Sequence, residues 1–164
     1  MFYPGTRRGT RPSAPHQAGG FAANGPGTSR GVKLLVLATD PVDADQVRRA
    51  LPGDELDGAE VLVVSPAVNE SAVAFWVSDS DEAIADAQSA AEATAAQLRE
   101  RGANARATTG ESEPLLALQD ALATYPADRV IVFVRDADGA RYREDDVIGE
   151  AQRRFGVPVT EVQQ

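Results

Sequence analysis

The sequence predicts a three-layer α/β domain built on a five-stranded parallel sheet with the strand order 3-2-1-4-5. From Gly31 onward, short apolar runs alternate with segments of helical periodicity, which is typical of a parallel sheet covered on both faces. The two most apolar runs, at 32–39 and 128–134, belong side by side at the centre of the sheet. With right-handed crossovers between parallel strands, the order 3-2-1-4-5 is the simplest that follows.

The first thirty residues differ in composition from the rest. Residues 1–30 hold six of the fourteen glycines and four of the ten prolines, with few large apolar side chains. Such a segment cannot offset its ordering entropy by burial. We therefore expect a disordered N-terminal tail over 1–30 and one folded domain over 31–164, a length that suits a single core.

The first half of the domain is expected to contain two strands and two helices. VKLLVLAT at 32–39 is the first strand, a short helix follows over 43–51, and AEVLVVSP at 59–66 is the second strand. The long second helix begins with a capping box of Ser78 and Asp81 and ends at Gly102. Its sheet face is predicted to consist of Ile84, Ala87, Ala91, Ala95 and Leu98.

The second half is expected to add three strands and two helices. NARATTG at 104–110 is more polar than the other strands and therefore belongs at a sheet edge. A helix with Pro114 in its first turn ends before Pro126 and carries a stripe of Leu115, Leu118 and Leu122. The remaining elements are a strand at 128–134, a helix at 144–155 and a strand at 157–162.

Composition excludes several classes of site. The chain has no cysteine, so disulfides, thiolate metal sites and a cysteine nucleophile are excluded. No run approaches the roughly 18 apolar residues of a membrane span, and residues 1–30 contain no apolar stretch of the kind that a secretory signal carries. We expect a soluble, cytoplasmic protein without membrane insertion.

The charge distribution argues against nucleic acid as a partner. The net charge is −9, and residues 1–30 contribute four arginines without an acid, which leaves −13 on the domain. A surface of this sign repels phosphate backbones. The arginines give the tail a positive charge, and their role is left open.

Beyond these patterns, the chain resembles the universal stress protein family over about residues 31–164. The motifs that carry the resemblance are, in order, LVLATD, VLVV, RERGANAR, GESEPLLALQDAL, ADRVIVF and PVTEV. It is more closely similar to small stress-protein-like domains of actinobacteria, some of which occur as extensions of amino-acid permeases. The resemblance implies a binding or regulatory domain, a homodimer formed through the last strand, and a membrane transporter as an alternative partner.

In nucleotide-binding members, the family implies a Gly-x-x-Gly-x9-Gly-Ser/Thr motif after the fourth strand that holds the phosphates of ATP. Here Asp145 and Asp146 fall near the position of its Gly-Ser pair, and Glu150 follows Gly149, where the motif has Ser or Thr. Carboxylates in this loop oppose a triphosphate. We therefore predict no ATP or AMP cofactor, with a nucleotide binder that uses a divergent loop as the alternative.

Candidate site residues lie where the strand order reverses, because ligands of such sheets bind beyond the carboxyl ends of the strands at this switch point. The resemblance places Asp40 on the aspartate that contacts the nucleotide base, although a turn or cap residue is the alternative. Val64 either lines the same crevice or belongs to the core. The full candidate set is Thr39, Asp40, Val64, Arg135, Asp136 and Gly139.

Other chemistry finds little support. The acids at 136, 138, 145 and 146 could ligate a hard divalent cation, but Asp145 and Asp146 fit better in the first turn of a helix, so no metal site is predicted. The only histidine, His16, lies in the tail, which excludes a Ser-His-Asp triad within the domain. The sequence also has no Gly-x-Ser-x-Gly elbow, no Gly-x4-Gly-Lys-Ser/Thr loop and no Gly-x-Gly-x-x-Gly motif after the first strand, so we expect no enzyme. Phe75 and Trp76 either cover the sheet end or form a lid or partner anchor.

Overall fold

The computed structural model describes residues 31–53, 56–67, 80–135 and 146–164. The predicted tail over 1–30 lies outside the described residues, as do Ser78 of the predicted capping box and the aromatic pair Phe75 and Trp76.

The domain is built on one parallel sheet of five strands, and its order β3-β2-β1-β4-β5 confirms the predicted order 3-2-1-4-5. β1 lies in the middle, where Leu35 pairs with Leu62 on one side and with Val130 on the other. The strands are Lys33–Leu37 (β1), Glu60–Pro66 (β2), Asn104–Gly110 (β3), Arg129–Val134 (β4) and Val159–Gln163 (β5).

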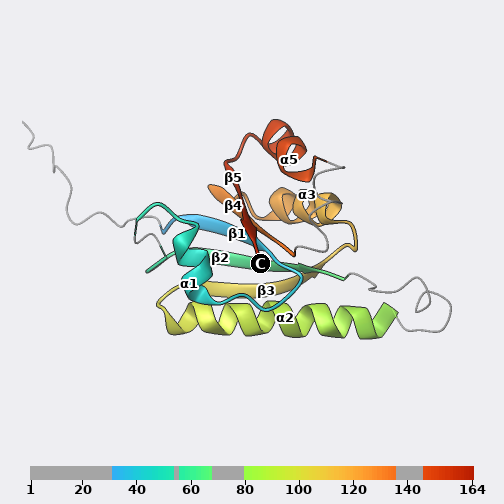
Figure 1. Ribbon diagram of the computed structural model, residues 1–164, viewed down its shortest axis with the longest axis horizontal. Coiled ribbons are helices and arrows are strands. Elements are labelled where there is room, and N and C mark those ends of the chain that lie inside the picture. Colours follow the sequence, from blue (N-terminus) through green and yellow to red (C-terminus); the bar gives the residue numbers. More distant parts are fainter. Residues whose placement is uncertain (1–30, 54–55, 68–79, 136–145) are drawn as a thin grey trace, which may run out of the picture.

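Four described helices cover the sheet, with α1 and α2 on one face and α3 and α5 on the other (Figure 1). Local signals set their ends. Asp43 and Gln46 form a capping box at α1, and Gly102, with φ +88°, supplies the left-handed residue that follows α2. The helices are Ala44–Arg49 (α1), Ser80–Glu100 (α2), Pro114–Thr124 (α3) and Val147–Phe155 (α5).

Two apolar cores lie on the two faces of the sheet, because successive side chains of a strand point to opposite faces. In β1, Leu34 and Val36 join the core under α1 and α2, whereas Leu35 and Leu37 join the core under α3 and α5. All four are fully buried. This two-sided burial explains why the strand is a continuous apolar run.

The predicted apolar face of α2 needs one correction. Ala87, Ala91, Ala95 and Leu98 are buried as predicted, but Ile84 is 46% exposed. α2 has 21 residues and spans about 31 Å, whereas the seven residues of β3 span about 23 Å. The first turns of α2 therefore extend beyond the carboxyl end of β3 (Figure 1), and Ile84, in the second of these turns, stays partly exposed.

The stripe predicted for α3 is also shifted. Leu118 is fully buried as expected, but its buried neighbours are Ala117 and Ala121. Leu115 and Leu122 are only partly buried and pack at the margin of the core. Small residues at the centre of the stripe let α3 approach the sheet closely.

Candidate functional site

The predicted switch point lies between β1 and β4, whose chains continue into helices on opposite faces of the sheet. Thr39 and Asp40 follow β1, and Arg135 follows β4. The Nε atom of Arg135 lies 3.4 Å from Oδ2 of Asp40, and the two side chains are 27% and 46% exposed. The structure therefore brings two of the predicted site residues into an ion pair.

The loop that carries Asp40 is held by hydrogen bonds from its neighbours. The amide of Val42 donates to Oγ1 of Thr94 at 2.9 Å, and that hydroxyl donates to the carbonyl of Ala90 at 3.0 Å. The hydroxyl of Ser65 donates to the carbonyl of Thr39 at 3.4 Å. Thr94 and Ser65 are buried polar residues, and both hold the Asp40 loop.

Sequence reasoning did not identify these two supporting residues. Thr94 could have been found, because it lies within the alanine-rich buried face of α2, where a lone hydroxyl needs a hydrogen-bond partner. Ser65 is the one buried polar side chain of β2, whose other polar residue, Glu60, is exposed at the start of the strand. Its partner on the β1 loop depends on the pairing of two strands, which local sequence does not give.

The sequence allowed two interpretations of Val64, as a residue of the crevice or of the core. Val64 is 1% exposed and belongs to the core under α3. Its carbonyl accepts a hydrogen bond of 3.1 Å from the amide of Ala38. Its side chain also forms part of the wall of a cavity that is lined by residues of β2, β3, α2 and α3. The remaining predicted candidates, Asp136 and Gly139, lie outside the described residues, as do Asp138, Asp145 and His16.

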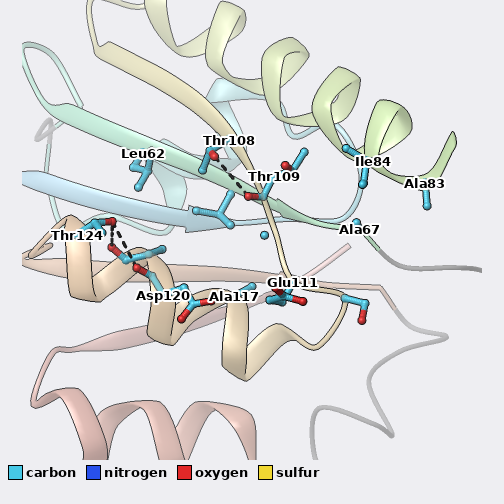
Figure 2. A pocket seen from close by; sticks show the side chains of 14 residues that line it. Leu62, Ala67, Ala83, Ile84, Thr108, Thr109, Glu111, Ala117, Asp120 and Thr124 are labelled. Carbon is cyan, nitrogen blue, oxygen red and sulfur yellow. Dashed lines mark hydrogen bonds between the residues drawn. The ribbon is translucent and has the colours of Figure 1, made fainter. Parts of the chain in front are cut away.

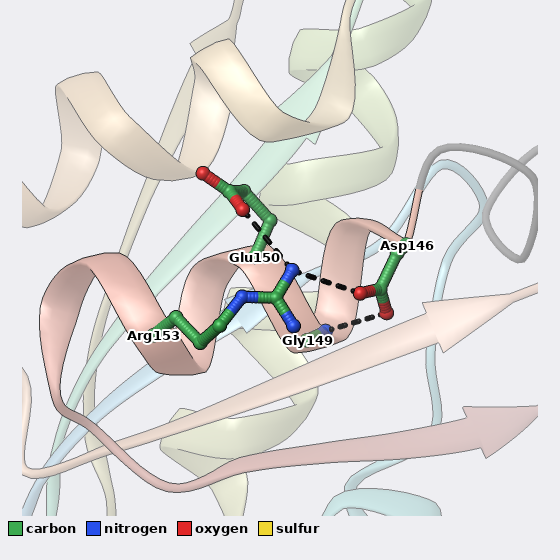
Figure 3. Close-up of polar contacts among 4 residues, drawn as sticks. All are labelled: Asp146, Gly149, Glu150 and Arg153. Atoms are coloured by element: carbon green, nitrogen blue, oxygen red, sulfur yellow. Dashed lines mark hydrogen bonds and ion pairs between the residues drawn. The ribbon is translucent and has the colours of Figure 1, made fainter.

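Asp146 is the N-cap of α5, the helix that follows β4 (Figure 3). Its backbone has φ 45°, a left-handed conformation that Asp tolerates better than most residues. Its carboxylate accepts a hydrogen bond from the amide of Gly149 at 3.2 Å and one from Arg153 at 2.9 Å. Asp146 thus lies at the N-terminus of the helix, as predicted from the sequence, and its carboxylate caps this end.

The helix end is also crowded around this carboxylate. A Cβ atom at Gly149 would collide with the Asp146 carboxylate, so a glycine suits the cap geometry here. The hydrogen bonds that Arg153 donates to Asp146 and Glu150 raise the pKa of its guanidinium. Gly149 therefore belongs to a capped helix and does not stand in an open loop.

A cavity of about 590 Å³ lies between β2, β3, α2 and α3 (Figure 2). Leu62 and Val64 of β2 and Ala117 of α3 contribute apolar walls, and Thr108 and Asp120 contribute polar groups. Gly110 permits the close approach of β3 to α3, since an added Cβ would lie 2.7 Å from Cβ of Ala117. Sequence reasoning missed this cavity because its walls come from four separate elements.

No protein-family model matches the chain, and no curated protein matches it. The resemblance to universal stress proteins therefore stays a prediction from sequence motifs.

Two further observations concern metals and membranes. Within the described ranges, no three His, Asp or Glu side chains gather in a group that could hold a metal ion. Among the helices described above, none combines the length and apolar character needed to cross a membrane.

Proposed function

We propose that the chain is a cytoplasmic, universal-stress-protein-like domain that acts as a binding or regulatory module and does not use ATP as its ligand. The parallel sheet with order 3-2-1-4-5 supports this proposal, because it provides a switch point beyond the carboxyl ends of β1 and β4. The sequence motifs of the family support the assignment to this class.

The observation that carries the proposal is the occupied N-terminus of α5. In phosphate-binding α/β domains, free backbone amides at a helix N-terminus and the helix dipole bind the anion. Here the amide of Gly149 is bound by the carboxylate of Asp146, which also pairs with Arg153 at 2.9 Å. A phosphate at this terminus would displace or repel a carboxylate of the chain itself.

The ion pair at the switch point supports the same conclusion. Asp40 is the residue that the family resemblance assigns to the nucleotide base, and its carboxylate lies 3.4 Å from the Arg135 guanidinium. A base that binds Asp40 would have to compete with this cation. Arg135 also favours the alternative of a divergent nucleotide site, because its positive charge at the switch point could contact a phosphate.

Thermal unfolding of the full chain with ATP, AMP and cyclic AMP, each with and without Mg²⁺, separates the two possibilities. We expect the same unfolding midpoint with and without each nucleotide. The Asp40→Ala variant is the matched control, since it removes the carboxylate that would contact the base. A reproducible stabilisation of the wild type that Asp40→Ala abolishes would reject the non-nucleotide function.

As part of this proposal, the domain forms a homodimer through β5, the edge strand of the sheet. The amide of Gln164 donates to the Val134 carbonyl, and the Val130 amide donates to the Pro158 carbonyl. In this strand, the backbone N–H and C=O groups of the even-numbered residues therefore point toward β4. By alternation, the backbone groups of Glu161 and Gln163 point outward. They are available for antiparallel pairing across a two-fold axis.

Proline at position 161 tests the homodimer. Glu161→Pro removes an outward amide and leaves the bonds to β4 intact, whereas Glu161→Ala keeps the amide. We expect light scattering at micromolar concentrations to give a dimer for the wild type and Glu161→Ala and a monomer for Glu161→Pro. A strictly monomeric wild type at tens of micromolar would remove the dimer from the proposal.

A further inference from the structure

The cavity beside β3 has an apolar floor and a polar rim. Its floor is formed by Leu62, Val64, Ala117 and Ala121, all from β2 and α3. Its volume of about 590 Å³ lies within the range of roughly 300–1,000 Å³ that small-molecule sites occupy. This combination suits a ligand with an apolar body and one polar group.

The rim offers hydrogen-bond acceptors. The hydroxyl of Thr108 donates to the Thr109 carbonyl at 3.3 Å, and that of Thr124 donates to the Ala121 carbonyl at 3.2 Å (Figure 2). Because each hydroxyl has a single hydrogen to donate, its oxygen is left to act as an acceptor. A ligand polar group that meets these side chains must therefore be a donor.

The charges of the rim have one sign. Glu111 and Asp120 line the cavity, and no described lining residue is Lys, Arg or His. Among the described residues, no cation lies within ion-pair distance of either carboxylate, whereas Asp40, Asp45 and Asp146 each have an arginine partner. The rim thus carries two negative charges that the described part of the domain does not neutralise.

A basic residue of the strand that lines the cavity makes its contact elsewhere. Arg106 lies two positions before Thr108 in β3, and its guanidinium lies over the ring of Tyr125, 5.8 Å from the centroid. It lines a separate hollow at the other end of the strand. The first turn of α3 has no side-chain cap, but its N-cap residue is Glu113, whose charge opposes an anion there.

We propose that this cavity binds a small organic cation, in which the negative charges of Asp120 and Glu111 at the rim attract an ammonium group and an apolar body rests on the β2 and α3 floor. The cavity has no described lining residue from β1 or β4 and shares only Val64 with the predicted switch-point residues. The inference therefore stands whether or not a nucleotide binds at Asp40.

Three probes with the same aromatic body and different charge test the ligand class. ¹H–¹⁵N NMR spectra of the full chain are recorded with 2-phenylethylammonium, 2-phenylethanol and 3-phenylpropionate. We expect saturable shifts of the Thr108, Gly110 and Ala121 amides with the cation, weaker shifts with the alcohol, and none with the anion. Added salt should weaken cation binding, because the rim carboxylates are exposed.

Charge removal at the rim tests the assigned residues. We expect Asp120→Asn with Glu111→Gln to weaken cation binding about three- to tenfold, the range of two exposed ion pairs. The matched control is Asp86→Asn with Glu100→Gln, which removes two exposed charges of α2 outside the cavity and should leave binding unchanged.

Three results would overturn the inference: equal shifts from all three probes, preferential binding of the anion, or equal loss of affinity in the two double variants. The probe comparison uses the wild-type chain alone, so it decides the ligand class even where a variant fails to fold.

Discussion

Arg135 at the end of β4 and Asp40 in the loop after β1 form an ion pair, with 3.4 Å between Nε and Oδ2. The pair spans the point where the strand order reverses, and neighbouring parallel strands bring its members together. Each side chain keeps part of its surface in solvent. Because partly exposed ion pairs contribute little to stability, we expect only a small contribution of this contact to the fold.

The first prediction concerns the energy of this pair. We expect a double-mutant cycle of Asp40→Asn and Arg135→Gln, measured by urea unfolding, to give a coupling energy of about 0.2–1 kcal/mol, because the pair is partly exposed. Zero coupling would contradict a contribution of the pair to stability, and more than about 2 kcal/mol would mean that the pair is buried in solution.

Thr94 should be far more important for stability than its size suggests. Thr94→Val keeps the side-chain shape but leaves the buried amide of Val42 without its acceptor, so we expect a loss of about 1–3 kcal/mol in the free energy of unfolding. Thr94→Ser keeps the acceptor and should lose only about 0.8 kcal/mol for one buried methyl group. Equal losses in the two variants would contradict the role of the hydroxyl.

The cap of α5 gives a third prediction. Asp146→Asn keeps a side-chain oxygen and tolerates the left-handed backbone, so its stability should fall little. Asp146→Ala loses the cap and strains the backbone, with an expected cost of about 1–3 kcal/mol. Chemical unfolding of both variants measures the difference. A smaller loss for Ala than for Asn would show that the carboxylate does not cap the helix.

Tyr125 should make stability depend on alkaline pH. Burial, with a smaller contribution from Glu60, raises the pKa of Tyr125 to about 12, and its hydroxyl donates to the Glu60 carbonyl at 2.8 Å. The unfolded chain loses this proton near pH 10, before the folded protein does. The tyrosine contribution is therefore complete below pH 10 and is lost as pH rises toward about 12.

Tyr125→Phe isolates this contribution. We expect the variant to be less stable at neutral pH by about 0.5–1.5 kcal/mol and to lose less further stability between pH 10 and 12. A tyrosinate absorbance titration, taken as the difference between wild type and variant, should show a group that titrates well above pH 10. A difference titration centred at pH 10 would contradict the buried, hydrogen-bonded phenol.

Local patterns were sufficient to predict much of the fold. Consecutive apolar residues, which are buried on both faces of the sheet, predict β1 and β4 as central strands. The more polar run at 104–110 predicts β3 as an edge strand. Asp43, Gly102 and Pro114 lie at helix ends because capping and backbone preferences act within a few residues. The position of Asp146 at a helix terminus was predictable for the same reason.

The candidate site was only partly predictable. Asp40 and Arg135 could be placed at the switch point because each follows a central strand, but their ion pair depends on strand pairing and side-chain conformation. Ile84 follows the helical period of α2 and is nevertheless exposed, because the helix is longer than the strand it covers. Helical periodicity describes a face of a helix and not the length of the surface beneath it.

By itself, then, the sequence determined the layers, the strand order and the helix ends, since burial periodicity and capping are local properties of the chain. Tertiary structure alone decided the partner of Asp40, the anchoring of its loop by Thr94, and the cavity with its acidic rim at Glu111 and Asp120. Each of these features involves residues that are distant in sequence. The distances between those residues depend on how helices of unequal length pack on a parallel sheet.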